Sequence, residues 1–369
     1  MADEARKARG LAAHEAFYPA AALYAALALP ASVLVMTGHR LPLPALAAPA
    51  AHAHEMLLGF ALAVVAGNQL GMASAGRIAG LLALWAAARA AFLVLPTSSL
   101  SVALNAAFAG LLAVQVAPRL FGSAKKLRNQ ALPAILAGLC IAAVSWELFY
   151  RSGSGTPARA VVLLFALLML FMGGRIIAPA VAGQLHRQGR PLDARVQPRL
   201  EGALLLAGMI ALLGLAVPSS PFISSVAAAA AGVLAAVRLV RWRLWALRGR
   251  ADLLCLAAGY AWLCAGLLAL GAALATGRLE SAAIHLITVG ALGTLTFNVM
   301  ALSWKLKARR SPEEGSAALV LGTSLLAAAA AARVAGAFDP APWLLVAAGC
   351  WAGAYVVLLG IFWRARRRA

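Results

Sequence analysis

Three side chains that can bind a metal or carry a proton stand together in the stretch AHAHEMLLGF, residues 51–60. Imidazoles such as those of His52 and His54 bind haem iron and copper, and a carboxylate such as that of Glu55 can relay protons inside a membrane. Residues two apart on a regular helix point about 200° apart. The two imidazoles could therefore share one small ligand only if one of them precedes the helix, which we expect to start near His52.

Another histidine opens a second stretch, HLITVGALGTLTFNVM. At about 100° per residue, a regular α-helix would put His285, Thr288 and Thr296 on one face. Gly290 and Gly293 would let a neighbouring helix or a flat cofactor approach closely. This stretch is therefore the second candidate for a cofactor site.

Three further charged side chains lie in apolar surroundings, namely Arg89 in LWAAARAAFLVLP, Glu147 in SWELFY and Arg175 in MGGRIIAP. A charge within the hydrocarbon region is costly unless it is paired or faces a polar cavity. Arg89 and Glu147 are therefore candidate site residues. Arg89 could instead extend outward along its own helix, and Arg175 could be a cytoplasmic-side anchor of that kind.

The elements that carry these residues are apolar along the whole chain, which is 63% hydrophobic and 12% charged with a mean hydropathy of +0.86. Runs of about 20 apolar residues have the length of a helix that crosses a bilayer. We expect an all-α polytopic membrane bundle, a single transmembrane domain over residues 1–369 in contact with lipid. The twelve expected spans are 17–36, 54–74, 76–95, 99–118, 131–150, 158–180, 200–217, 221–240, 252–276, 281–303, 315–336 and 342–363.

The positions of the basic residues predict the orientation. Of the 32 Lys and Arg residues, 25 fall on one side of the expected spans and 5 on the other. Cytoplasmic loops carry the excess of positive charge, so both termini should be cytoplasmic, including the leader MADEARKARG. His54, Glu55, Arg89, Glu147 and His285 should then lie at one depth in the outer leaflet.

Charge and cysteine usage exclude several classes of protein. The net charge of +20 lies in short loops between spans, so we expect no nucleic-acid partner. The four cysteines lie in apolar runs without a C-x-x-C or C-x-x-C-H motif, which argues against disulfides, thiolate zinc sites and covalently attached haem. No P-loop, nucleophile elbow or H-E-x-x-H motif is present, so whether the protein is an enzyme stays open.

The candidate stretches resemble those of the NnrS family, haem- and copper-containing membrane proteins linked to bacterial nitric oxide, nitrosative stress and denitrification. The resemblance runs through most of the chain, and twelve spans also match. Its motifs are HAHEMLLGFALAVVAG (52–67), LWAAARAA (84–91), MGGRIIAP (172–179) and HLITVGALGTLTFNVM (285–300).

The resemblance implies haem or copper roles for His52, His54 and His285, and functional weight for Arg89 and Arg175. It implies a b-type haem, with copper as a second metal, in a multi-pass protein of the bacterial inner membrane that meets nitric oxide or another small gas. It does not say which histidine takes which metal.

Two stretches depart from the family pattern. Where members tend to carry a Pro-Asn-Trp stretch, this chain reads GNQLGMASAG. Where members often carry a further histidine near a Gly-His-Thr-Gly run, it reads ALSWKLKARRSP, with Trp304 and Lys305. The chain would then have one fewer histidine for a second metal.

Two other classes of function stay open on the residues alone. A proton-coupled secondary transporter without a redox cofactor would use Glu55, Glu147 and the histidines as a relay. No clear sequence repeat relates residues 1–184 to residues 185–369, although transporters with twelve spans often have one. A structural partner in the membrane, with incidental histidines, is the third reading.

Overall fold

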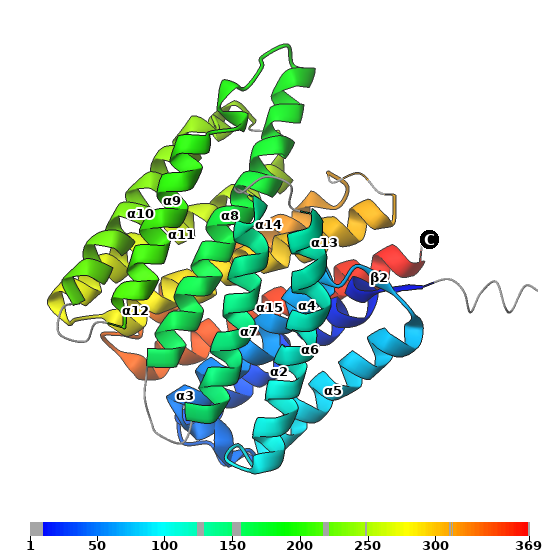
Figure 1. Ribbon diagram of the computed structural model, residues 1–369, viewed down its shortest axis with the longest axis vertical. Helices are drawn as coiled ribbons and strands as arrows, with labels where there is room; N and C mark the ends of the chain where they lie inside the picture. The colour runs from blue at the N-terminus through cyan, green and yellow to red at the C-terminus, as the bar shows by residue number, and fades with distance from the viewer. Residues whose placement is uncertain are drawn as a thin grey trace, which may run out of the picture. The chain divides into compact units, whose positions relative to one another are not determined.

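The computed structural model describes residues 10–123, 129–149, 156–216, 221–247, 249–309, 311 and 313–367. Most of the leader MADEARKARG and several loop cations, such as Lys125 and Lys126, lie outside these ranges. The chain forms two compact units, Met1–Val161 and Val162–Ala369. The described residues are almost entirely helical, as the sequence predicts (Figure 1).

The first unit is built from apolar helices and one short pair of strands. The β1 strand, Leu11–Ala12, pairs antiparallel with β2, so that Leu11 lies opposite Ala73. The remaining elements are α2 (Ala13–Met36), a 3₁₀ turn (Pro44–Ala47), α3 (Pro49–His54), a π-helical segment (Glu55–Ala61), α4 (Leu62–Gln69), β2 (Met72–Ala73), α5 (Ala75–Val94), α6 (Ser99–Ser123) and α7 (Ala131–Phe149).

The described part of the second unit contains seven further long helical segments, of which α9, α10 and α11 lie side by side (Figure 1). Its first helix, α8, begins in the last residues of the first unit. The elements are α8 (Thr156–Arg187), a 3₁₀ turn (Asp193–Arg195), α9 (Pro198–Gly214), α10 (Pro221–Arg241), a 3₁₀ turn (Leu244–Leu247), α11 (Ala251–Thr276), α12 (Glu280–His285), a π-helical segment (Leu286–Gly293), α13 (Thr294–Lys307), α14 (Ser316–Ala335) and α15 (Pro340–Arg367).

Eleven helical segments in the described part of the chain are long and apolar enough to cross a membrane. They correspond to eleven of the twelve expected spans. The remaining expected span, 200–217, corresponds to α9, which has 17 residues and is not among the eleven. The multi-pass helical architecture is therefore confirmed, while the orientation of the termini stays a prediction.

The helix that carries the second expected span, 54–74, runs from Pro49 to Gln69, so it begins and ends about five residues earlier. Pro49 lies at the first helical position, where its missing N–H costs nothing. After Gln69 the chain turns at Gly71, with a φ of +68°, and then enters β2. His52 and His54 are consequently both inside the helix rather than at its lead-in.

Two spans contain a π-helical segment, and each segment follows a histidine directly. Glu55–Ala61 follows His54, and Leu286–Gly293 follows His285. In both cases a glycine stands five residues after the histidine, at Gly59 and Gly290. In a π-helix the backbone hydrogen bonds join residues i and i+5, so successive side chains are not 100° apart. The expectation that a regular α-helix follows His285 is therefore wrong. Such segments are rare and frequently occur at functional sites.

The two π-helical segments occupy equivalent places in a repeated arrangement of four spans. The first packs between α2 and α5, and α5 pairs with α6. The second packs between α11 and α14, and α14 pairs with α15. An aromatic ring from the preceding span covers the glycine in each, Tyr24 at Gly59 and Trp262 at Gly290. A comparison of the two halves of the chain misses this repeat, because it relates residues 13–123 to residues 251–367.

Close helix packing in the second unit depends on glycine at specific positions. A Cβ at Gly322 of α14 would overlap the fully buried Phe297 ring, which cannot move aside. We expect Gly322→Ala to lower the free energy of unfolding by about 1–3 kcal/mol. Gly349→Ala in α15 is the control, because a Cβ there meets nothing within 4 Å. Thermal unfolding of the two variants in detergent compares them, and equal midpoints would contradict the packing argument.

Candidate functional site

The carboxylate of Glu55 is the centre of a buried ionic cluster in the first unit. Glu55 is fully buried at the start of its π-helical segment. Its Oε1 lies 2.8 Å from His54 Nδ1 and accepts a hydrogen bond of 2.5 Å from Arg89 Nη1. Its Oε2 accepts a hydrogen bond from the Tyr24 hydroxyl. Side chains from α2, α3 and α5 thus converge on one carboxylate.

Arg89 links this carboxylate to α6. Its Nη2 donates to the side-chain carbonyl of Asn105, whose amide donates to the Ser101 carbonyl oxygen at 2.9 Å. The Nε–H of Arg89 is buried and has no acceptor among the described residues. A Cβ at Gly59 would lie 2.9 Å from Arg89 Nη1, so the missing side chain at Gly59 leaves room for the guanidinium. Arg89 is therefore a paired internal charge rather than one that extends outward to water.

His54 lies between two carboxylates. Its Nδ1 contacts Glu55 and its Nε2 contacts Glu147 of α7. The ring is fully buried and stacks on Phe92, with centroids 3.8 Å apart and planes at 8°. Two carboxylates, one guanidinium and one imidazolium sum to zero, so the buried cluster is neutral when both ring nitrogens of His54 carry protons.

This arrangement bears on metal binding by His54. A metal takes the lone pair of a neutral imidazole nitrogen. Both nitrogens of His54 face carboxylates, so a metal at Nε2 would have to displace Glu147 and remove a proton. In this structure His54 holds the ionic cluster together, and its ligand role stays a prediction.

His52 points elsewhere on the same helix. Its Nδ1 lies 3.0 Å from the hydroxyl oxygen of the buried Ser32 on α2, and the ring is partly exposed. Because His52 and His54 are both inside α3, they contact different partners. The structure thus gives two separate histidine environments where the sequence allowed one shared site.

His285 in the second unit is held differently. Its Nδ1 lies 2.6 Å from the carbonyl oxygen of Ser281, one turn earlier in α12. A carbonyl oxygen can only accept, so Nδ1 carries the proton and, in the neutral ring, Nε2 carries the lone pair. A hydrogen bond from the second ring nitrogen to a backbone carbonyl is the usual support of a metal-binding histidine. The residue as a whole is partly exposed.

The glycines of the MGGRIIAP stretch pack against a buried arginine, but this arginine comes from another helix and is not Arg175. Arg175 is exposed, with its guanidinium 4.4 Å from the centre of the Phe171 ring. The buried arginine is Arg238 of α10, which donates to the Leu170 carbonyl at 2.8 Å and pairs with Glu201 at 3.2 Å. A Cβ at Gly174 would overlap its guanidinium. The double glycine was the sequence signal for this contact, but it does not identify the partner.

Among the described residues, no three His, Cys, Asp or Glu side chains form a group that could hold a metal ion. Lys305, in the stretch ALSWKLKARRSP, is buried and donates to the Glu314 carbonyl at 2.6 Å. The described residues therefore do not form a ready multi-ligand metal site.

The apolar spans and their internal charges define a multi-pass helical membrane protein with a buried ionic cluster beside a π-helical segment. The model of the NnrS protein family matches residues 11–368. The chain therefore belongs to the NnrS family. No curated protein matches it.

The ionic cluster makes a direct prediction about stability. Replacing Arg89 with Gln should lower the free energy of unfolding by about 3–5 kcal/mol, because it leaves Glu55 buried and unpaired. Adding Glu55→Gln should recover part of that loss, since no charge then lacks its partner. Chemical unfolding of the single and double variants in detergent measures this coupling.

Arg175→Gln is the control for loss of an arginine within a span, because Arg175 is exposed. It should leave stability nearly unchanged. A double variant whose loss equals the sum of the two single losses would contradict direct pairing of Arg89 and Glu55.

Proposed function

We propose that this protein is a haem-carrying inner-membrane protein of the NnrS type that acts in the bacterial response to nitric oxide and nitrosative stress. Family membership and the membrane-spanning helices support the class. The excess of basic residues on one side supports cytoplasmic termini. Haem iron supplies a binding site for diatomic gases, and a membrane protein meets such gases where they concentrate.

The observation that carries the proposal is the state of His285. Its Nδ1–H is fixed on the Ser281 carbonyl, and the ring is partly exposed directly before a π-helical segment. His285 would hold the haem iron through Nε2, because its Nδ1 proton is already bonded to a carbonyl oxygen. A b-type haem fits, because one or two imidazoles suffice and no C-x-x-C-H motif is present.

His52 is the histidine of the first unit that best fits a second ligand role, because Ser32 can orient its ring and the ring is partly exposed. Copper would need ligands beyond His52, since no group of three metal-binding side chains occurs among the described residues. Haem is therefore the primary cofactor that we propose, and copper a secondary one.

Absorbance spectroscopy of the purified protein tests this function. The wild type should show a Soret band that shifts on dithionite reduction and again on addition of nitric oxide, with iron near one per chain. His285→Ala should lose the band because it removes the imidazole that would hold the iron. His285→Gly should regain it with added imidazole.

His39→Ala serves as the control, since His39 is an exposed residue outside the spans. It should leave the spectrum unchanged. A Soret band of full intensity and unaltered position in His285→Ala would refute the ligand assignment, and iron-free, colourless wild type from iron-supplied cells would refute haem.

A specific observation favours proton-coupled transport as the second candidate function. Glu55, His54 and Glu147 form a continuous chain of buried proton-carrying groups that links α3 to α7. Such chains occur in pumps and transporters. If this function holds, a pH gradient should drive proton flux into proteoliposomes. Glu147→Gln should abolish that flux, while Glu313→Gln, at an exposed carboxylate of the second unit, should retain it.

A further inference from the structure

An arginine of the second unit lies beside the histidine that would hold the haem iron. Arg333 is in the last turn of α14, and its Nη2 donates to the Ser281 hydroxyl at 3.0 Å. His285 bonds to the carbonyl oxygen of the same serine at 2.6 Å. Because α14 packs against both α12 and the π-helical segment, the guanidinium and the imidazole meet at one residue of α12.

The charge of Arg333 has no counter-charge within the part of the chain that the structure describes. There its hydrogen-bond partner is the Ser281 hydroxyl, and no carboxylate forms an ion pair with it. The residue is partly buried, and an arginine in a span is unfavourable unless it is paired or faces a polar site. The excess of cytoplasmic cations does not explain its position, since it is one of the few on the expected outer side.

The repeat of four spans indicates which group would pair with this arginine. In the first copy, α5 brings Arg89 to Glu55, the residue directly after the histidine. In the second copy, α14 brings Arg333 to within about one turn of His285, but the residue after the histidine is Leu286. The second copy therefore has the arginine and lacks the carboxylate, so a carboxylate of a bound ligand can take that place.

We propose that Arg333 binds a carboxylate of the ligand that His285 holds, so that the two residues form a two-point binding site. This inference rests on the proposed function, in which the ligand is a b-type haem. Haem b carries two carboxylate side chains on one edge of its ring, and an arginine can bind a carboxylate through two parallel hydrogen bonds. Arg333 would thereby fix the orientation of the ring at His285.

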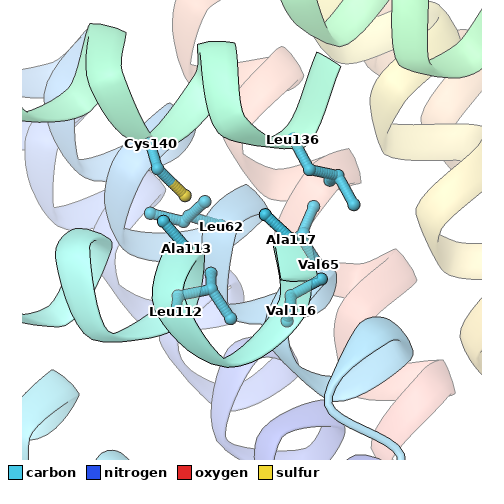
Figure 2. A pocket seen from close by; sticks show the side chains of 8 residues that line it. All are labelled: Leu62, Val65, Leu112, Ala113, Val116, Ala117, Leu136 and Cys140. Carbon is cyan, nitrogen blue, oxygen red and sulfur yellow. The ribbon is translucent and has the colours of Figure 1, made fainter. Parts of the chain in front are cut away.

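The described part of the first unit offers no comparable place for such a ligand. Both terminal nitrogens of Arg89 already donate to Glu55 and Asn105. A small cavity between α4, α6 and α7 has a volume of about 10 Å³, which is room for about one water molecule. Figure 2 shows aliphatic side chains around it, with the Cys140 sulfur as the only heteroatom among them.

Titration with haemin and with its dimethyl ester tests the proposal. The ester has the same iron and ring but no charged carboxylate. Each form is added to the full-length protein in detergent, prepared without haem, and the Soret band reports the affinity. The wild type should bind haemin about 10- to 100-fold more tightly than the ester, because the ester cannot form the charged hydrogen bonds to Arg333.

Three variants assign this preference to Arg333. Arg333→Gln should lower the affinity for haemin by about the same factor and leave the affinity for the ester unchanged. Arg278→Gln is the matched control, because Arg278 is an exposed arginine just before α12, and it should keep both affinities. Ser281→Ala removes the hydroxyl that orients Arg333 but keeps the carbonyl that bonds to His285, so it should lower the affinity for haemin alone.

Equal affinities of the wild type for haemin and the ester overturn the proposal. An equal loss of both affinities in Arg333→Gln also overturns it, as expected if the arginine only supports the fold. So does an unchanged affinity for haemin, as expected if a lipid headgroup or the carbonyl end of α14 neutralises the charge. If Arg333→Gln does not fold, Ser281→Ala decides by the same criteria.

The titration also separates this inference from the haem proposal. A wild type that binds neither form refutes both. A wild type that binds both forms equally retains haem and refutes only the contact between Arg333 and a carboxylate.

Discussion

The burial of the Glu55 carboxylate against Arg89 is the constraint on which the first unit depends. A charge removed from water inside an apolar bundle requires a partner and satisfied hydrogen bonds. Arg89 provides the charge, while Tyr24 and His54 contact the remaining positions on the carboxylate. Because Arg89 also binds Asn105 and His54 also binds Glu147, the cluster fixes the positions of α2, α3, α5, α6 and α7 relative to one another.

The repeat of four spans gives this cluster a counterpart with different chemistry. In both copies a histidine ends a short α-helix, a π-helical segment follows, and a glycine lies under an aromatic ring. In the first copy the residue after the histidine is Glu55, and in the second it is Leu286. The first histidine is therefore enclosed by carboxylates, whereas His285 contacts a backbone carbonyl. The same local backbone arrangement thus holds a charged centre in one unit and an imidazole that contacts a backbone carbonyl in the other.

Along α6 and α7, a level of polar side chains lies next to a level of aliphatic side chains. Polar side chains at Asn105 and Glu147 join the ionic cluster, and two turns away the same faces carry aliphatic side chains around a cavity. The cluster holds the helices at one level, and small side chains such as Ala113 leave space at the next.

The sequence by itself determined the architecture and the residue types of the site. Apolar runs of membrane length fix helices, since no other open structure satisfies the backbone in lipid. A charged side chain in the hydrocarbon region is unfavourable unless it is paired, and this indicated that Glu55, Arg89 and Glu147 need partners. The sequence did not reveal Tyr24, Asn105 or Arg238, because nothing in a helical run tells which turn of one helix meets which turn of another.

Only the tertiary structure decided how these groups are used. The π-helical segments turn the residues after each histidine away from regular α-helical positions, which a 100° periodicity cannot anticipate. The contacts of His54 with two carboxylates, and of His285 with Ser281, distinguish two histidines that look alike in the sequence. The availability of a ring nitrogen is set by its neighbours in space, and most of those neighbours come from other helices or from another turn of the same one.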